Sequence, residues 1–234
     1  MNKEEFVKLT SKNGLSLTDE QYSQLEEYWT LLVEKNKVMN LTGITEHDEV
    51  LEKHFYDSLL FTFDYKINSQ KLIDVGTGAG FPGLVLAICY PSLRVSLLEP
   101  LTKRCNFLQE VVDKLSLKNV EIINERSEDF SKNHEEEFDI VCFRAVSRLN
   151  ILLEIGSKML KVNGDLIALK GRAYQEEVDE CTNAFKKLNL VLDKIQTATL
   201  PSENDVRGNV FVKKIGHTPL GYPRNYGQIK KKPL

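Results

Sequence analysis

Residues 72–83 read Leu72-Ile73-Asp74-Val75-Gly76-Thr77-Gly78-Ala79-Gly80-Phe81-Pro82-Gly83, an apolar run that leads into a glycine-rich turn. Glycine permits tight turns and close approach of the backbone to a ligand, and Pro82 suits the first turn of a helix. The pattern therefore predicts a strand, a turn and a helix. In a doubly wound sheet, such a turn at the carboxyl end of a strand is the usual ligand crevice.

The chain on either side of this turn alternates between short apolar runs and helical spans, which is typical of a parallel sheet with crossover helices. No helix fits between the last two runs, because residues 200–208 are a polar loop, so that pair is predicted to be antiparallel. The expected fold class is α/β and Rossmann-like, with a seven-stranded, mostly parallel sheet and an antiparallel last strand. Strands are predicted at 71–75, 95–99, 120–124, 139–144, 164–170, 190–199 and 209–215, and helices at 81–90, 102–115, 149–160 and 174–188.

The N-terminal part of the chain has a helical period instead. Apolar residues recur at intervals of three and four over 18–39, with Thr18 and Asp19 available as caps, and a second helix is expected over 47–63. We predict an N-terminal helical extension at 1–66 and a ligand-binding domain with a basic tail at 67–234, together forming one compact unit.

Composition indicates a globular protein, with 41% hydrophobic and 28% charged residues. No apolar stretch reaches the ~18 residues of a membrane span, and residues 1–10 lack the apolar core of a signal peptide. The four cysteines are widely spaced and match neither a zinc pattern nor a disulfide framework. We expect a cytoplasmic protein without a membrane anchor or a metal.

Charge is distributed unevenly along the chain. The whole sequence carries −3, yet residues 206–234 contain no acid and seven cations: Arg207, Lys213, Lys214, Arg224, Lys230, Lys231 and Lys232. A positive patch is what binding to nucleic-acid phosphates requires. A solvated tail that favours solubility has the same composition, so charge alone leaves both interpretations open.

The glycine spacing also contains Gly78-x-Gly80-x-x-Gly83, which occurs in dinucleotide-binding enzymes. An NAD-dependent oxidoreductase is therefore one alternative. Asp74, two residues before Gly76, favours another cofactor, because Asp-Val-Gly-x-Gly-x-Gly resembles motif I of class I methyltransferases. A carboxylate there would repel a pyrophosphate, whereas it can organise the loop and orient the methionine part of S-adenosylmethionine.

Further candidate residues follow the ends of the later predicted strands. Glu99, 19 residues after Gly80, is placed to accept hydrogen bonds from ribose hydroxyls, although a surface acid would look the same. Residues 126–129, with Ser127 and Glu128, would border the adenine or form a solvated turn. Arg144 ends a strand at the same edge and is a site candidate or an ion-pair partner. Lys170 and Arg172 would meet RNA phosphates or solvent.

Taken together, these motifs resemble the bacterial 16S rRNA guanine-N(7) methyltransferase family, also called glucose-inhibited division protein B. The resemblance covers almost the whole chain. The matching segments are Asn40-Leu41-Thr42, 54–59 with His54 and Asp57, 74–83, Arg144-Ala145, Lys170-Gly171 and 223–234. One departure is that Asn225-Tyr226 stands where family members tend to have a second basic residue after Pro-Arg.

The resemblance implies a class I methyltransferase that uses S-adenosylmethionine, with 16S rRNA or the small ribosomal subunit as its partner. The cofactor would contact Gly76, Phe81, Ser127-Glu128 and Arg144, with Glu99 at the ribose, in a loop formed by Asp74, Gly76, Gly78 and Gly80. RNA would meet Lys170, Arg172, Arg207, Arg224 and Lys230 to Lys232. A monomer is expected. A non-catalytic RNA-binding protein of the same fold is a further alternative.

Methyl transfer to N7 of guanine requires no proton transfer by the protein, because N7 has an in-plane lone pair and needs no deprotonation. We therefore expect no general base and assign the rate enhancement to positioning and exclusion of water. His54, Asp57 and Arg144 are the candidates for positioning. Paired at helical spacing, His54 and Asp57 would face the crevice or, alternatively, would pin the N-terminal helices to the sheet.

Overall fold

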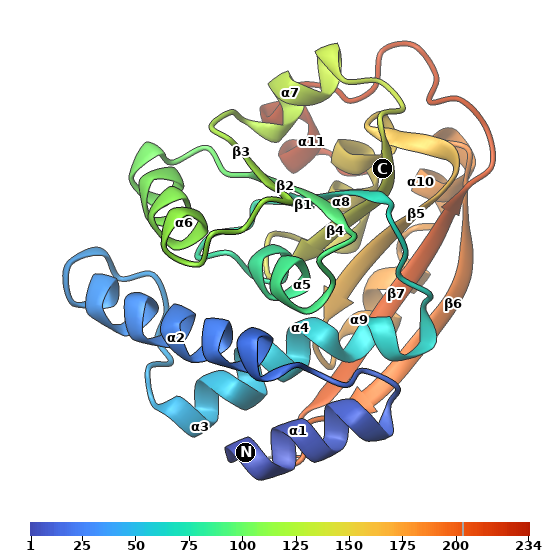
Figure 1. Cartoon of the computed structure of the whole chain (residues 1–234). Coiled ribbons are helices and arrows are strands. Elements are labelled where there is room, and N and C mark those ends of the chain that lie inside the picture. Colours follow the sequence, from blue (N-terminus) through green and yellow to red (C-terminus); the bar gives the residue numbers. More distant parts are fainter. Residues whose placement is uncertain (203) are drawn as a thin grey trace.

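A computed structural model describes residues 1–202 and 204–234 (Figure 1). The seven strands are β1 (Lys71–Val75), β2 (Arg94–Leu98), β3 (Val120–Ile123), β4 (Phe138–Arg144), β5 (Leu160–Lys170), β6 (Leu190–Thr199) and β7 (Val206–Lys214). They form one sheet in the order β3-β2-β1-β4-β5-β7-β6, in which β1 to β5 are parallel and β7 is antiparallel to both of its neighbours. The predicted α/β fold with an antiparallel last strand is confirmed.

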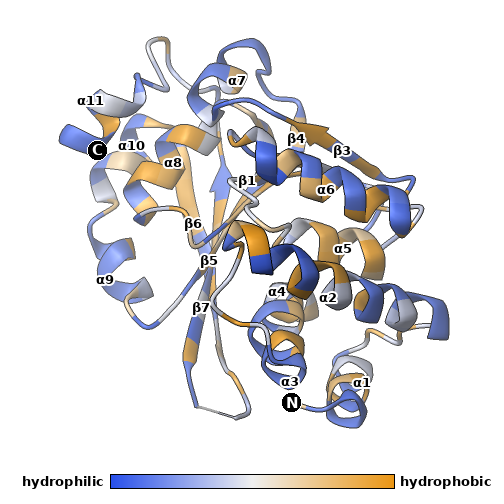
Figure 2. Cartoon of the chain, turned by 90° about the vertical axis from the view of Figure 1, so that its left-hand side faces the viewer, coloured by the Kyte–Doolittle hydropathy of each residue, from blue (hydrophilic) through white to orange (hydrophobic). Residues whose placement is uncertain are grey.

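Helices cover both faces of this sheet. Their bounds are α1 (Lys3–Lys12), α2 (Asp19–Met39), α3 (His47–Val50), α4 (Asp57–Leu59), α5 (Gly83–Cys89), α6 (Thr102–Lys114), α7 (Ser127–Asn133), α8 (Leu149–Ser157), α9 (Tyr174–Asp179), α10 (Thr182–Lys187) and α11 (Tyr226–Lys231). Alternate residues of a strand point to opposite faces. Leu72 therefore joins the core under α1, α2, α5 and α6, while Ile73 joins the core under α7, α8, α10 and α11. The helices turn apolar residues to the sheet and hydrophilic ones outward (Figure 2).

The N-terminal helices share a core with the sheet domain. Thr18 caps α2 in a reciprocal capping box with Gln21, as the sequence suggested for this position. The Gln21 side chain also donates to the backbone oxygens of Ile88 and Cys89 at the end of α5. Buried Leu25 and Tyr28 of α2 lie in the same hydrophobic cluster as the residues of α5.

The predicted helix over 47–63 has an irregular course. It consists of α3, a π-helical segment at Leu51–Tyr56, α4 and a 3₁₀ helix at Leu60–Asp64. A π-helical turn inserts one extra residue and offsets backbone carbonyls from their usual partners, and such turns are frequent at functional sites. The segment contains His54 and ends next to Asp57.

Other differences from the sequence-based expectation concern short elements. The single helix predicted over 174–188 is wrong, because α9 and α10 are separate and Cys181 is buried between them. The helices α1, α7 and α11 were not expected. Within residues 1–202 and 204–234, no helix has both the length and the apolar character that a membrane span needs.

Candidate active site

The glycine-rich loop leaves β1 at the carboxyl edge of the sheet. Gly78 and Gly80 have φ angles of +62° and +106°, which side chains rarely adopt. A Cβ on Gly80 would lie 2.4 Å from Cδ1 of Leu84, whereas a Cβ on Gly78 would have no neighbour closer than 3.9 Å. The loop is therefore tightly packed against Leu84 at Gly80, whereas it leaves room for a ligand at Gly78.

Asp74 lies beneath this loop and is fully buried. Its Oδ2 accepts hydrogen bonds from the Thr77 hydroxyl at 2.6 Å and from the Gly83 backbone N–H at 2.8 Å. Burial raises the pKa of Asp74 to about 6, against the effect of these two hydrogen bonds. Its Oδ1 has no hydrogen-bond partner among the described residues. The carboxylate thus fixes both ends of the loop and keeps one acceptor oxygen unused.

Glu99 follows β2 and holds the same loop from the other side. Its Oε2 accepts from the Gly78 backbone N–H at 3.1 Å, and its Oε1 accepts from Leu101 N–H at 3.0 Å. Arg104 lies 3.6 Å from Oε2. Only 2% of the Glu99 side chain is exposed, so the residue is no ordinary surface acid.

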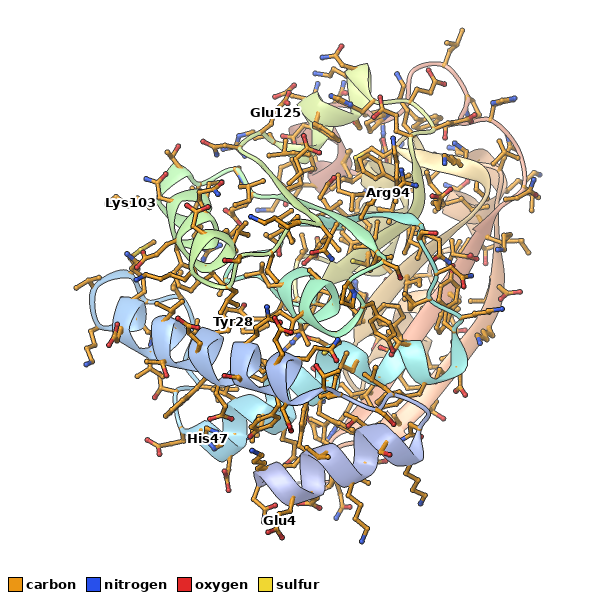
Figure 3. All side chains as sticks on the ribbon, viewed as in Figure 1. Glu4, Tyr28, His47, Arg94, Lys103 and Glu125 are labelled. Atoms are coloured by element: carbon orange, nitrogen blue, oxygen red, sulfur yellow. The ribbon has the colours of Figure 1, made fainter. Side chains whose placement is uncertain are left out.

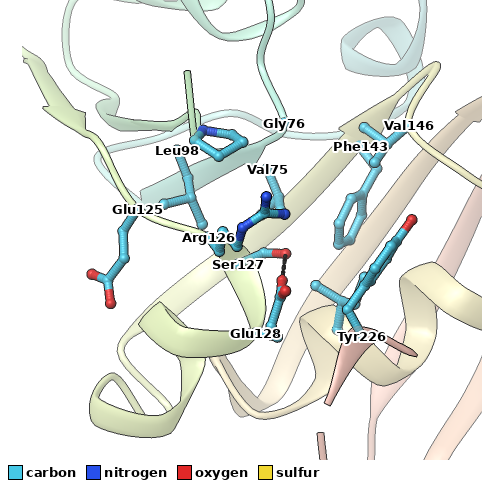
Figure 4. A pocket seen from close by; sticks show the side chains of 12 residues that line it. Val75, Gly76, Leu98, Glu125, Arg126, Ser127, Glu128, Phe143, Val146 and Tyr226 are labelled. Carbon is cyan, nitrogen blue, oxygen red and sulfur yellow. Dashed lines mark hydrogen bonds between the residues drawn. The ribbon is translucent and has the colours of Figure 1, made fainter. Parts of the chain in front are cut away.

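An apolar cavity opens beside the loop (Figure 4). Its walls come from the ends of β1, β2 and β4, from the start of α7 and from α11; they include Gly76, Leu98, Ser127, Phe143, Val146 and Tyr226. The Ser127 hydroxyl donates to Glu128 at the rim, at 3.3 Å. The cavity measures about 190 Å³, less than the ~300–1,000 Å³ of pockets for a whole drug-sized ligand. Its size suits one flat part of a cofactor.

These features fit S-adenosylmethionine. The open face at Gly78 would take the middle of the cofactor, and the apolar cavity would take its base. The carboxylate of Glu99, which already accepts from the Gly78 backbone N–H, supplies acceptors for its polar groups, while buried Asp74 holds the loop from beneath. Of the nine cofactor residues named from the sequence, Gly76, Ser127 and Glu128 line the apolar cavity, and Asp74, Gly78 and Glu99 form or hold the loop beside it. The other three do not line this cavity: Gly80 is packed against Leu84, Phe81 stacks on His54, and Arg144 lines a separate, polar cavity.

A second, polar cavity of about 370 Å³ lies on the other side of the loop that follows β4. It is lined by Asp57, Arg144, Ala145, Ser147, Lys170 and Arg207, among others. Val146 of the same loop lines the apolar cavity, whereas its neighbours Ala145 and Ser147 line the polar one. The two cavities therefore meet across a single stretch of backbone.

Arg144 joins the end of β4 to the π-helical segment. Its guanidinium donates to the backbone oxygens of Lys53 and His54 at 2.6 and 3.1 Å and to the Ser58 hydroxyl at 3.0 Å. It also lies 3.4 Å from Oδ2 of Asp57 and 5.5 Å from the centre of the Phe81 ring. The ion pair with an acid, one of the two interpretations above, is present, and 15% of the Arg144 side chain stays exposed to the polar cavity.

Helical spacing suggested that His54 pairs with Asp57, but the two side chains do not pair in the structure. The Nε2 of His54 is 2.8 Å from the Thr42 hydroxyl, its Nδ1 accepts from Arg144 at 3.0 Å, and its ring stacks on Phe81 with centres 4.5 Å apart. The expected pairing is wrong because each group has other partners: the Asp57 carboxylate meets Arg144 and Arg207 instead of the imidazole. Burial and the positive charge of Arg144 lower the pKa of His54 to about 3, so the ring is neutral.

The cations of residues 206–234 do not form one free patch. Four of the seven meet acids from distant parts of the chain: Arg207 with Asp57, Lys213 with Asp165, Lys214 with Glu136, and Arg224 with Glu154. Arg207 also pairs with its near neighbour Asp205. The summed charge of +7 therefore overstates the local field, because folding pairs charges that the sequence separates. Lys230, Lys231 and Lys232 are exposed and make no ion pair with the residues that the structure describes.

The rim cations named from the sequence differ in accessibility. The Lys170 side chain is 9% exposed, and its ammonium pairs with Glu177 and donates to the Ser147 backbone oxygen. Arg172 is 71% exposed and bonds only to Asp205 among the described residues. Arg172 is therefore open to solvent, whereas Lys170 holds the wall of the polar cavity.

Sequence reasoning missed two aromatic residues of the site. Tyr28 of α2 points toward α5 (Figure 3), and its buried hydroxyl donates to the Ala79 backbone oxygen of the glycine loop at 2.6 Å. Tyr226 of α11 lines the apolar cavity. Both come from helices that are far from the glycine loop in the sequence. In the sequence, Tyr226 alone had a signal, as part of the departure from the family pattern at Asn225-Tyr226.

Comparison with known proteins supplies the family context. A family model described as "rRNA small subunit methyltransferase G" matches residues 21–205. A protein of Mycoplasma capricolum named "Ribosomal RNA small subunit methyltransferase G" is 46% identical over 95% of both chains. A protein of Brevibacillus brevis with the same name is 43% identical over the full length of both.

Solved structures show the same fold at low sequence identity. M. jannaschii TYW2, determined in complex with AdoMet, is 15% identical, covers 74% of this chain and 80% of its own, and superposes with a TM-score of 0.58. A 16S rRNA (adenine(1408)-N(1))-methyltransferase variant of Catenulisporales acidiphilia with cosubstrate SAM is 14% identical and has a TM-score of 0.52, with 65% and 88% of the two chains covered.

Proposed function

The chain belongs to the family of rRNA small subunit methyltransferase G, and on that premise we propose that it transfers a methyl group from S-adenosylmethionine to N7 of a guanine in 16S rRNA. Family membership sets aside the NAD-dependent oxidoreductase that the glycine spacing allowed. The intact glycine loop, held by Asp74 and Glu99, argues against a non-catalytic RNA-binding protein.

One observation carries the proposal: the loop after β4 separates an apolar cavity from a polar one. Val146 faces the first, beside the glycine loop, while Arg144 and Ser147 face the second. A methyltransferase must hold a donor and an acceptor within reach of each other. The apolar cavity and the glycine loop suit the cofactor, and the polar cavity suits the guanine.

In this mechanism the protein positions the reactants and moves no proton. When bound, S-adenosylmethionine would supply an electrophilic methyl group and leave as S-adenosylhomocysteine, and N7 of guanine would accept the methyl through its in-plane lone pair without losing a proton. Arg144 and Lys170 are held in fixed positions by backbone oxygens and carboxylates, so the wall of the polar cavity that would receive the base is preorganised. His54 is neutral and engaged at both ring nitrogens, and it supports Phe81 and Arg144.

The RNA partner would be met first by exposed cations. Arg172 is exposed and follows Gly171, which lines the polar cavity, and Lys230 to Lys232 stand at the C-terminal end of α11. We propose that these residues contact phosphates, that the small ribosomal subunit or its precursor is the physiological substrate, and that the protein acts in the cytoplasm as a monomer. Phosphate contacts of this kind make binding sensitive to salt.

The test is methyl transfer from labelled S-adenosylmethionine to unmethylated small-subunit particles and to naked 16S rRNA, with mass spectrometry of the digested nucleosides. We expect 7-methylguanosine from at least one substrate. Asp74→Ala should abolish labelling, while Asp113→Ala, an exposed acid on α6, should retain it. If the cofactor binds but neither RNA is labelled, the RNA assignment is wrong. If the cofactor does not bind, the enzyme assignment fails as well.

A further inference from the structure

Tyr226 occupies a position that its sequence context does not explain. It is the first residue of α11, a helix in the basic tail, yet its ring lines the apolar cavity opposite Ser127 and beside Phe143 and Val146 (Figure 4). The residue is 37% exposed. An exposed aromatic wall in a cavity is available for contact with a ligand.

The backbone on both sides of Tyr226 is anchored. Arg224 donates to the carboxylate of Glu154 from its backbone N–H at 2.9 Å, from Nε at 2.8 Å and from Nη2 at 2.6 Å. Glu154 lies on α8 and is fully buried, and Ile229 of α11 is fully buried in the same hydrophobic cluster as α8. Asn225 caps α11 by accepting from the Gln228 backbone N–H. Tyr226 is thus held over the cavity and does not hang in solvent.

The chemistry of the cavity selects which part of the cofactor Tyr226 would meet. Ribose hydroxyls and the amino-acid part need charged or polar partners, and those lie at Glu99 and the glycine loop. The cavity is walled mainly by apolar and aromatic side chains, with Ser127 and Glu128 at its rim. A flat heteroaromatic base with polar edge atoms matches this arrangement, because its faces can stack while its edge forms hydrogen bonds.

We propose that α11 completes the adenine pocket of this enzyme, with the Tyr226 ring as one wall and the Arg224–Glu154 ion pair as its anchor. The proposal rests on the proposed function, because it names the part of S-adenosylmethionine that Tyr226 contacts. It gives Arg224 a positioning role in cofactor binding in place of a contact with RNA.

The first experiment measures binding of S-adenosylhomocysteine and of 5′-methylthioadenosine, which lacks the amino-acid part, by isothermal titration calorimetry. Loss of base–aromatic stacking, about 1–3 kcal/mol, predicts that Tyr226→Ala raises both dissociation constants by the same factor, about 5- to 150-fold. Tyr226→Phe keeps the ring and should bind within about twofold of the wild type. Leu220→Ala, an exposed apolar residue of the same segment, is the control and should change neither constant.

Several outcomes contradict the inference separately from the proposed function. If the wild-type protein binds S-adenosylhomocysteine and Tyr226→Ala binds it equally well, the pocket does not include Tyr226, although the enzyme assignment stands. A loss confined to S-adenosylhomocysteine places Tyr226 at the amino-acid part and contradicts the adenine assignment. A Tyr226→Phe variant as weak as Tyr226→Ala contradicts stacking. A wild-type protein that binds neither compound contradicts the proposed function itself.

The anchor is tested by a double-mutant cycle on the same dissociation constants. Arg224→Lys keeps the positive charge near Glu154 but loses the bidentate geometry. If Arg224 acts through Tyr226, Arg224→Lys weakens binding in the wild-type background and adds little in the Tyr226→Ala background. Urea denaturation of each variant confirms that it is folded at the temperature of the titration. Fully additive effects would show that Arg224 does not act through the tyrosine.

Discussion

Asp57 and Arg207, which are 150 residues apart in the chain, form a nearly buried ion pair in which Arg207 Nε donates to Asp57 Oδ1 at 2.9 Å. Asp57 follows the π-helical segment, and Arg207 lies on β7. Because Arg144 lies on the other side of the same carboxylate, Asp57 separates two guanidinium groups at the wall of the polar cavity. One acid thus holds together the N-terminal helices, the last strand and the end of β4.

Asp57→Asn should destabilise the fold by about 3–5 kcal/mol, the usual cost of breaking a buried ion pair. The substitution leaves two positive charges without their shared counterion. The free energy of unfolding from urea denaturation measures the loss. Asp129→Asn is the matched control: its pair with Lys132 is about half exposed on both sides, and we expect a change within about 1 kcal/mol. Equal losses in the two variants would contradict this role of Asp57.

Gly83→Ala should destabilise the protein by about 1–3 kcal/mol, although alanine is the better helix former. A Cβ at this position would lie 2.3 Å from Cδ2 of Leu97 and 2.9 Å from Oδ2 of Asp74, so the start of α5 must move away from the sheet. Thermal and urea unfolding measure the effect. Gly43→Ala, where a Cβ meets nothing within 4 Å, should stay within about 0.5 kcal/mol. A stabilised Gly83→Ala variant would contradict the close packing.

The His54 imidazole should remain neutral down to about pH 5, because its pKa is lowered to about 3. Proton NMR of the ring resonances, assigned with His54→Gln, should show no movement of the His54 signal between pH 8 and pH 5. The His47 signal serves as an internal comparison, since Glu26 and Asp48 raise its pKa against the effect of burial. A His54 midpoint near pH 6.5 would contradict the burial of its ring against Arg144.

The same shift has a consequence for stability, with a defined sign. The unfolded chain protonates His54 below its ordinary value of 6.5, while the folded protein does not. The contribution of His54 to the free energy of unfolding is therefore fully present above pH 6.5 and declines as the pH falls below that value. At pH 5 the loss amounts to about 2 kcal/mol. Asp74 acts in the opposite direction, because its pKa is raised to about 6, so the informative quantity is the difference between the wild type and His54→Gln at pH 7.5 and pH 5.

Replacing Lys230, Lys231 and Lys232 together by glutamine should weaken RNA binding and reduce the slope of log affinity against log salt by about 2–3, since each phosphate contact contributes about 0.7–0.9. Filter binding or anisotropy at several salt concentrations measures the slope. The matched control replaces three exposed lysines of the N-terminal helices, Lys8, Lys12 and Lys37. An equal effect of both triple variants would indicate general electrostatics and no tail-specific contact.

The sequence predicted the sheet and the cofactor loop because both depend on local signals. Glycines at a strand end, an acid two residues before them and apolar runs of strand length are visible in the residues themselves, and β1 spans the predicted range. The capping box at Thr18 is equally local. Short helices such as α7 and α11 lack these signals, since six or seven residues contain too few apolar positions to show a period.

The ion pairs of the site and the wall that α11 adds to the apolar cavity could not be predicted from such local signals. Arg224 and Glu154 are separated by 70 residues, and nothing near either one indicates the other. His54 and Asp57 likewise take partners from distant segments, Arg144 of β4 for both and Arg207 of β7 for Asp57, which their helical spacing does not indicate. The summed charge of the tail misled for the same reason, because partners such as Glu136 and Asp165 come from other elements.

Strand β7 lies between β5 and β6, although it follows both of them in the chain. During synthesis, one edge of β5 therefore stays unpaired, and β6 has no strand to pair with, until Val206–Lys214 has been synthesised. Open strand edges invite pairing with other chains. A nascent chain that stalls or is cut before residue 206 would expose such edges, so premature termination should yield aggregates and chaperone-bound fragments, with no partly active enzyme.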